Sequence, residues 1–288
     1  MAPSPSLTHL LTTSLLLLLF SSVLATPHGK NKNNDPHQKA PSFKPGPHSP
    51  PLPAAPFTPP EDPPTHYGVL LFRAFELMDI YGPLDILQLL AHNRHLTLSL
   101  LSRTLLPVTT EPSSPMMNTH QSIFWPTITP THTFSSPPSN LEVLIVPGGP
   151  GARSPDLAPE LQFIREIFPK LKYLITICTG SGIAAQSGVL DGYRATTNKA
   201  AWAVMTAMGP KVKWVSPARW VEDGKVWSSS GVTAGIDLIY EFLKQKYPNG
   251  TELAKRFGEI TEYEPETDWR KDPWSKRLGV PVTQPGRL

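Results

Sequence analysis

The stretch ITICTGSGIAAQSGVLDG, residues 175–192, contains the only cysteine of this 288-residue chain. Cys178 follows three residues that favour β-structure and precedes a run of small residues that predicts the start of a helix. A cysteine at such a corner is either a small buried hydrophobic residue or a nucleophile. The rest of the sequence has to distinguish these two interpretations.

Strands and helices alternate on both sides of this corner. Continuous apolar runs at 67–72, 141–146 and 173–177 predict buried parallel strands, and 157–168 carries apolar residues at helical spacing. The other expected elements are strands at 96–101, 194–196, 213–215 and 225–228, and helices at 84–90, 199–208 and 234–247. The pattern predicts an α/β fold with a doubly wound, mostly parallel sheet flanked by helices.

The helix at 84–90 follows Gly82-Pro83, and proline favours the first position of a helix. Residues 105–139 are rich in Pro, Thr and Ser, so we expect short strands and loops there.

The amino-terminal part differs from this globular pattern. Residues 1–25 resemble a secretory signal peptide, with cleavage expected between Ala25 and Thr26. The alternative is an uncleaved anchor, but the apolar core of eleven residues is short for a membrane-spanning helix of about 20. The proline-rich residues 26–65 predict a disordered or polyproline-II linker.

We therefore expect an α/β domain at 66–247 and a C-terminal extension at 248–288. Asn249 begins an Asn-Gly-Thr glycosylation sequon, which together with the signal predicts a secreted glycoprotein. The net charge of +3 is scattered, without a stripe of Lys and Arg, so we expect no nucleic-acid partner. The extension carries five prolines and does not read as a helix-turn-helix.

Cys178 has neighbours that suit catalysis. The carboxyl ends of parallel strands meet at one edge of the sheet, which places Gly148 and Gly149 near it. A helix N-terminus stabilises a thiolate and lowers the pKa of a cysteine. The backbone N–H groups of the two glycines are candidates for an oxyanion hole or substrate-binding site.

A family resemblance adds to this interpretation. Residues 177–197 resemble the nucleophile-elbow signature of the ThiJ/PfpI superfamily, which is related to class I glutamine amidotransferases. Four further segments agree in order and spacing: 69–72, 78–83, 146–149 and 230–237. The resemblance spans about 67–247 and is greatest to the isonitrile hydratase-like branch, through Asp-x-x-Gly-Pro at 79–83. It implies a flavodoxin-like sandwich, no metal or organic cofactor, and a possible homodimer.

The resemblance also implies roles for site residues. Cys178 would be the nucleophile, Asp79 its acid/base partner, and Thr179 would position water or a leaving nitrogen. Capping of the following helix is the alternative role for Asp79. Glu76 is a rival carboxyl group three residues earlier.

One departure from the family concerns histidine. All nine histidines lie at or before His132, and Asn198 stands where many members carry a histidine. This removes the Cys–His pairing that a peptidase needs. His120 or His132 could reach Cys178 from the loop region, although ordinary surface or core positions are the alternative.

The resemblance implies a cysteine-dependent hydratase or lyase that acts on a small molecule of the isonitrile class. Two alternatives stay open: a non-enzymatic thiol redox sensor or binding protein, and glyoxalase- or deglycase-like activity on small aldehydes. Phe124, Trp125 and Trp202 are candidates for the wall of an apolar pocket, and core packing is the alternative for each.

Overall fold

The computed structural model describes residues 62–283, all within the compact unit His48–Leu288. The expected signal peptide, its cleavage site and most of the proline-rich linker lie outside the described residues. Within 62–283, every helix is too short or too polar to cross a membrane.

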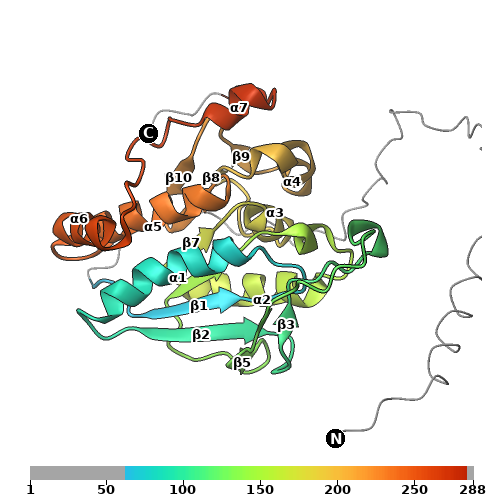
Figure 1. The fold of residues 1–288 in the computed structure, drawn as a ribbon, viewed down its shortest axis with the longest axis horizontal. Helices are drawn as coiled ribbons and strands as arrows, with labels where there is room; N and C mark the ends of the chain where they lie inside the picture. The colour runs from blue at the N-terminus through green and yellow to red at the C-terminus, as the bar shows by residue number, and fades with distance from the viewer. Residues whose placement is uncertain (1–61, 284–288) are drawn as a thin grey trace, which may run out of the picture. The chain divides into compact units, whose positions relative to one another are not determined.

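A seven-stranded sheet forms the centre, in the order β10-β11-β7-β6-β1-β2-β5 (Figure 1). Its strands are β1 (His66–Leu70), β2 (Thr97–Ser102), β5 (His132–Thr133), β6 (Val143–Val146), β7 (Tyr173–Thr176), β10 (Trp220–Asp223) and β11 (Val226–Ser229). All neighbours pair in parallel except β10 and β11, which are antiparallel. The predicted doubly wound, mostly parallel α/β fold is therefore confirmed.

Helices cover the sheet. The larger ones are α1 (Leu77–Ala91), α2 (Ala158–Ile167), α3 (Gly180–Gln186), α4 (Trp202–Met208), α5 (Val232–Lys246), α6 (Gly250–Thr261) and α7 (Pro273–Arg277). Helix α1 packs on α5, and α2 packs on α3. The crossovers β1–α1–β2 and β6–α2–β7 run in opposite directions along the sheet, so right-handed connections place α1 and α2 on opposite faces.

The short elements lie around this framework. Two further pairs of strands, β3 (Val108–Thr109) with β4 (Thr127–Ile128) and β8 (Arg194–Ala195) with β9 (Lys213–Trp214), stand outside the main sheet. The 3₁₀ segments are η1 (Pro115–Met117), η2 (Pro150–Arg153), η3 (Phe168–Lys170) and η4 (Lys199–Ala201).

The strand order of the sheet indicates where a ligand-binding site is expected. After β1 the chain moves to β2, whereas after β6 it moves the other way, to β7. The carboxyl ends of β1 and β6 are therefore the switch point of the sheet, where doubly wound folds bind ligands. Asp79 follows β1, Gly148 follows β6 and Cys178 follows β7, so all three reach this edge.

Helix α1 differs from the prediction. It begins at Leu77 rather than Leu84, so Pro83 lies inside it and Asp79 lies in its first turn. Proline has no backbone N–H, so Pro83 cannot donate the helical hydrogen bond to the carbonyl of Asp79. The apolar side chains of Ile80 and Leu90 are fully buried, and this packing outweighs the cost of the proline.

Strand β10 was not predicted, because its four residues pair only with β11 at the edge of the sheet. The other expected elements agree with the structure within about three residues, and 105–139 does contain short strands and loops.

The segment after residue 247 packs on the domain. Helix α6 lies against α5, and the hydroxyl of Tyr263 donates to Asp237 Oδ1 at 2.7 Å. Thr283 forms an isolated antiparallel bridge with Ser216. Asn249 is exposed just before α6, and its glycosylation stays a prediction.

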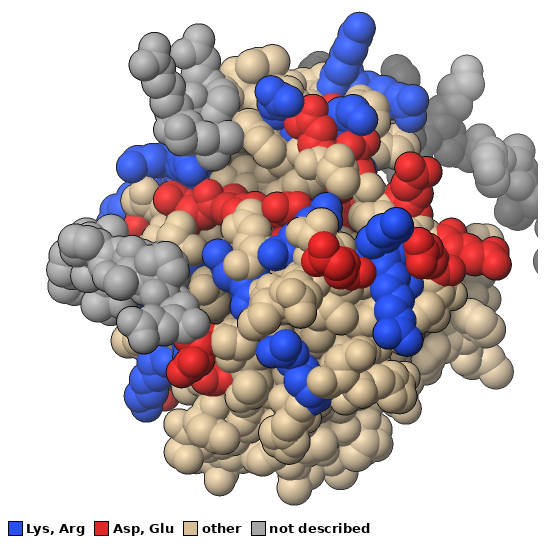
Figure 2. Space-filling view, turned by 90° about the vertical axis from the view of Figure 1, so that its left-hand side faces the viewer, with Lys and Arg blue, Asp and Glu red and all other residues tan. Residues whose placement is uncertain are grey.

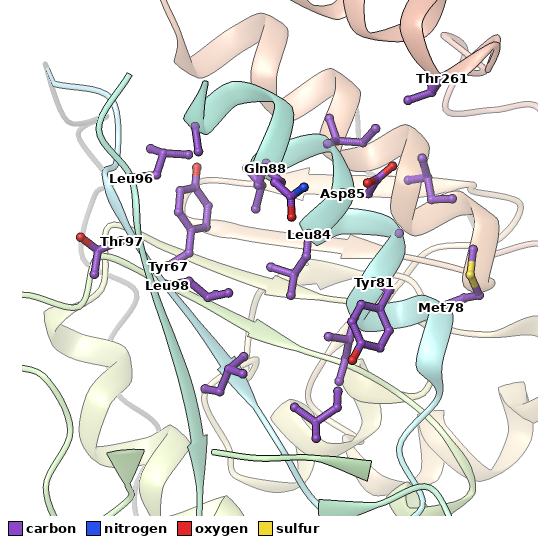
Figure 3. Close-up of a pocket in the computed structure, with 18 of the residues that line it drawn as sticks. Tyr67, Met78, Tyr81, Leu84, Asp85, Gln88, Leu96, Thr97, Leu98 and Thr261 are labelled. Carbon is purple, nitrogen blue, oxygen red and sulfur yellow. The ribbon is translucent and has the colours of Figure 1, made fainter. Parts of the chain in front are cut away.

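On the face seen in Figure 2, Lys and Arg form no stripe and are interspersed with Asp and Glu. An apolar groove of about 700 Å³ lies between α1 and β2, and Figure 3 shows Tyr81, Leu84 and Leu98 along it. The connection from β2 to β5 holds no α-helix that could cover this part of β2.

The expected pocket aromatics lie elsewhere. Phe124 is 87% exposed at the end of the β3–β4 connection, and Trp125 is half-buried beside it. Trp202 is buried and packs edge-on against Trp214, with ring centroids 6.2 Å apart. Of the three, only Trp202 lies in the core.

The start of α3 leaves no room for a side chain. A methyl group at Gly180 would clash with the carbonyl oxygens of Val146 and Pro147. We expect Gly180→Ala to lower the free energy of unfolding by about 2 kcal/mol, or about 4–8 °C in Tm. Gly231→Ala is the matched control, since Gly231 has a φ of −93° and nothing near its added methyl. Equal Tm values for the two variants would contradict this packing.

Candidate active site

Cys178 occupies a strained corner between β7 and α3. Its φ is +57°, a left-handed conformation that non-glycine residues rarely adopt and that costs about 1–3 kcal/mol. Two hydroxyl groups hold the corner: Ser181 Oγ and Thr197 Oγ1 donate to the carbonyl of Cys178 at 3.0 and 3.1 Å. This is the geometry of a nucleophile elbow.

Asp79 reaches the same edge from α1. It is fully buried, and its Oδ2 accepts the backbone N–H of Gly148 at 2.7 Å. Within 62–283 its Oδ1 has no hydrogen-bond partner. Backbone bonds tie the loops after β1 and β6 together: Glu76 N–H donates to Gly148 O at 2.8 Å, and Gly151 N–H to Ala74 O at 2.9 Å. The carboxyl group is therefore fixed by backbone geometry.

Gly148 and Gly149 have a different use from the expected oxyanion hole. The N–H of Gly148 is bonded to Asp79, and the N–H of Gly149 donates to Thr179 Oγ1 at 2.9 Å. A Cβ atom on Gly148 would lie 2.6 Å from Thr179 Oγ1 and 2.9 Å from Asp79 Oδ2. The two glycines thus let Asp79 and Thr179 approach, and their N–H groups orient these side chains instead of a substrate.

The Thr179 side chain is hydrogen-bonded to the loop after β6. Its hydroxyl accepts from Gly149 N–H and donates to Gly149 O at 3.2 Å. Its backbone N–H hydrogen-bonds the sulfur of Cys178. The part of Thr179 that faces the thiol is therefore its backbone.

Asn198 is the site residue whose role sequence reasoning missed. Its Nδ2 donates to Cys178 Sγ at 3.2 Å, while its Oδ1 accepts from Ala200 and Ala201 N–H at 2.9 and 3.2 Å. The two backbone donors fix which end of the amide faces the sulfur. An amide donates but takes up no proton, so Asn198 stabilises negative charge on sulfur without acting as a base. The polar run 196–199, directly after a strand, was the available signal.

No histidine of residues 62–283 enters the site. His132 lies on β5, four strands from β7, or about 19 Å at the usual spacing. His120 is exposed beyond η1. In the part of the chain that the structure describes, no hydrogen bond joins a histidine to Cys178. The acid/base groups near the sulfur are carboxyls, Asp79 and, more remotely, Glu76.

Burial decides the protonation of the pair. Cys178 is 6% exposed, and burial, then the charge of Asp79, raise the pKa of its thiol to about 12, against the hydrogen bonds from Asn198 and Thr179. Burial also raises the pKa of Asp79 to about 7, assisted by Glu76 and opposed by the Gly148 hydrogen bond. The expected thiol of lowered pKa is therefore wrong for the resting site, because desolvation outweighs the helix N-terminus.

These protonation states define the chemistry available. Near neutral pH, a carboxyl that is part ionised lies beside a protonated thiol. Such a carboxylate can take the thiol proton when an electrophile approaches, and can then return it. The Asn198 amide and the Thr179 N–H are in place to stabilise the sulfur as its charge develops.

The site is separate from the apolar groove. Met78 and Tyr81 of α1 line the groove, but neither Asp79 nor Cys178 does. Across residues 62–283, no three His, Cys, Asp or Glu side chains are grouped as metal ligands.

Removing the Asp79 charge tests how the carboxylate affects ionisation of the Cys178 thiol. A neutral side chain no longer opposes ionisation of the sulfur, so Asp79→Asn lowers the pKa of Cys178. We expect the pH at which iodoacetamide alkylation of Cys178 is half-maximal to fall in this variant. Asp85→Asn, an exposed site on the same helix, is the control. An unchanged or higher midpoint in Asp79→Asn would mean that the carboxylate does not oppose ionisation of the thiol.

The pKa of Asp79 also links stability to pH. It rises from 3.8 to about 7 on folding, so the protonated form favours the folded state, and this contribution is full below pH 4 and lost as the pH rises to 7. The loss is up to about 4 kcal/mol. In urea unfolding, Asp79→Asn should gain roughly 2–4 kcal/mol over the native chain at pH 8 and little at pH 4. A gain that is the same at both pH values would contradict the raised pKa.

Comparisons with known proteins agree with this geometry. A sequence profile of the DJ-1/PfpI family matches residues 68–245. Isonitrile hydratase of Pseudomonas putida is 32% identical over 201 residues, which cover 69% of this chain and 78% of that protein. The HTH-type transcriptional regulator GbdR of Pseudomonas aeruginosa is 28% identical over 156 residues, covering 53% of this chain and 41% of the regulator.

Solved structures share the fold. A ThiJ/PfpI family protein from Pseudomonas syringae has a TM-score of 0.58 at 24% identity, with 81% of this chain and 92% of that chain covered. DJ-1beta of Drosophila melanogaster has a TM-score of 0.53 at 15% identity, with 69% and 98% covered. The sequence match spans most of the domain and the strained cysteine lies in its expected place, so this chain belongs to the DJ-1/PfpI family.

Proposed function

We propose that this chain is a cysteine-dependent hydratase that converts a small isonitrile, R–N≡C, and water into the N-substituted formamide. The observation that carries the proposal is the buried pair of Cys178 and Asp79, with an amide donor on the sulfur and no histidine bonded to it in 62–283. The 32% identity to isonitrile hydratase supports the substrate class.

The first step forms a thioimidate. The terminal carbon of an isonitrile accepts both a nucleophile and a proton, so one carboxyl group is enough to serve it. The Asp79 carboxylate takes the thiol proton as Cys178 Sγ bonds to that carbon, then gives the same proton to the carbon. The product is R–N=CH–S–Cys178, and Asp79 is again a carboxylate. Its pKa near 7 suits both directions of proton transfer.

The second step adds water. Asp79 takes a proton from water as the hydroxyl bonds to the carbon, and passes that proton to the nitrogen, giving R–NH–CH(OH)–S–Cys178. The C–S bond then breaks, the hydroxyl proton moves to Asp79, and the leaving sulfur takes it back. The Asn198 amide stabilises the sulfur as it departs. Formamide and the starting thiol are the products.

Two other functions, redox sensing and peptidase activity, fit the site less well. A redox-sensing cysteine needs an exposed thiol of low pKa, whereas Cys178 is 6% exposed with a pKa raised to about 12. Thiol peptidases need a histidine base, and Asn198 occupies the position beside the sulfur.

Turnover by the full-length chain tests the proposal. Purified protein incubated with a small aliphatic isonitrile should release one formamide for each isonitrile consumed. Cys178→Ala and Asp79→Asn should each lower kcat at least 10³-fold, whereas the exposed Asp85→Asn should match the native chain. Formamide production that survives Cys178→Ala, or no production by the folded native chain from a panel of small isonitriles, would refute the assignment.

A further inference from the structure

A buried lysine next to the active site is unused by the proposed reaction. Lys199 is 5% exposed. Its Nζ donates to Thr196 Oγ1 and Ala218 O at 2.8 Å and to Thr197 O at 3.2 Å. Among residues 62–283, the one carboxylate paired with it is Asp272, whose Oδ2 lies 3.2 Å from Nζ.

This ion pair is buried. The side chains of Lys199 and Asp272 are 2% and 1% exposed. A buried charge is tolerated when a partner and hydrogen bonds compensate its lost hydration, and loss of one partner leaves the other uncompensated. The position of Lys199 therefore depends on Asp272.

Lys199 is joined to the reactive sulfur through its own loop. Asn198, its neighbour in the chain, donates to Cys178 Sγ, and Thr197 Oγ1 donates to the Cys178 carbonyl. The Lys199 ammonium binds Thr196 and Thr197 of the same loop. The loop that carries the amide donor is thus tied to the ammonium group at two successive residues, Thr196 and Thr197.

Asp272 is itself firmly placed, although it lies 94 residues further along the chain than Cys178 (272 − 178). Ser275 Oγ donates to its Oδ2 at 2.6 Å, and Trp274 N–H donates to its Oδ1 at 3.1 Å. Ala218 N–H donates to Oδ2 at 3.3 Å. The start of α7 therefore presents a fixed carboxylate to Lys199.

We infer that Asp272 is a positioning residue: its ion pair with Lys199 holds the Asn198 amide against the Cys178 sulfur, so that the segment after α6 completes the active site. The inference rests on the proposed function only for its kinetic readout. Without the carboxylate, the ammonium group moves toward water, and the Asn198 backbone moves with it. The sulfur then loses the donor that stabilises its developing charge.

The side-chain amide of Asn198 reports this position without any turnover. In ¹⁵N spectra its two protons are identified by their loss in Asn198→Ala. Asp272→Asn should move them to the positions of a free amide. Asp268→Asn is the matched control, because Asp268 pairs with exposed Arg270 in the same segment. Unmoved amide signals in a folded Asp272→Asn chain would overturn the inference.

Kinetics give a second readout. We expect Asp272→Asn to lower kcat for the isonitrile about tenfold, with KM changed less than twofold. Combined with Asn198→Ala, it should add no further loss, because both changes remove the same hydrogen bond. Multiplied losses in the double variant would mean that Asp272 acts by another route.

A milder variant serves as the control in case Asp272→Asn fails to fold. Ser275→Ala keeps both charges and removes the 2.6 Å hydrogen bond to Asp272 Oδ2. If Asp272→Asn does not unfold cooperatively, Ser275→Ala decides: a partial shift of the Asn198 amide signals supports the inference, and native signals overturn it. The amide signals can be measured even if the chain does not turn over isonitriles. The positioning role of Asp272 and the hydratase function can therefore be refuted independently of each other.

Discussion

The site depends on one constraint, which is that a thiol and a carboxyl are buried together at the edge of a parallel sheet. Burial raises the pKa of both Cys178 and Asp79 because water is excluded from each, and the charge of Asp79 further opposes ionisation of the thiol. Neither group is held as a stable ion by a strong counter-charge. Because Asp79 loses its proton near neutral pH and Cys178 keeps its own, the carboxyl can take the thiol proton during the reaction and pass it to the substrate.

Backbone geometry keeps this pair in place. The left-handed φ of Cys178 forms the corner between β7 and α3, and the N–H of Gly148 holds Asp79. Glycine at 148 is required by contact, since a Cβ there would meet both Asp79 and Thr179. The cost of the strained cysteine is met by the surrounding packing, as is usual for functional corners.

Much of this could be predicted from the sequence. Apolar runs locate strands because a parallel strand is buried on both faces, so the sheet edge that gathers Asp79, Gly148 and Cys178 followed directly. The start of α1 could not be predicted, because Gly82-Pro83 favours a helix boundary locally and only the tertiary packing of Ile80 overrides it.

For other features the local sequence did not indicate the interaction partner or the effect of burial. The pKa of Cys178 was predicted in the wrong direction because the helix N-terminus is visible in a sequence whereas desolvation is not. The Asn198 donor and the Lys199–Asp272 pair join residues 20 and 73 positions apart (198 − 178 and 272 − 199), distances over which no periodicity carries information. Such pairings appear only when the chain has folded.

The protonation of Asp79 tests the account most directly. The carboxylic acid band of Asp79 is obtained by subtracting the infrared spectrum of Asp79→Asn from that of the native chain, and is followed from pH 3 to pH 9. The account predicts that the band disappears with a midpoint near pH 7. A midpoint near pH 4, the ordinary value for an aspartate, would show that the carboxyl carries no proton to exchange with the Cys178 thiol, and would contradict the account.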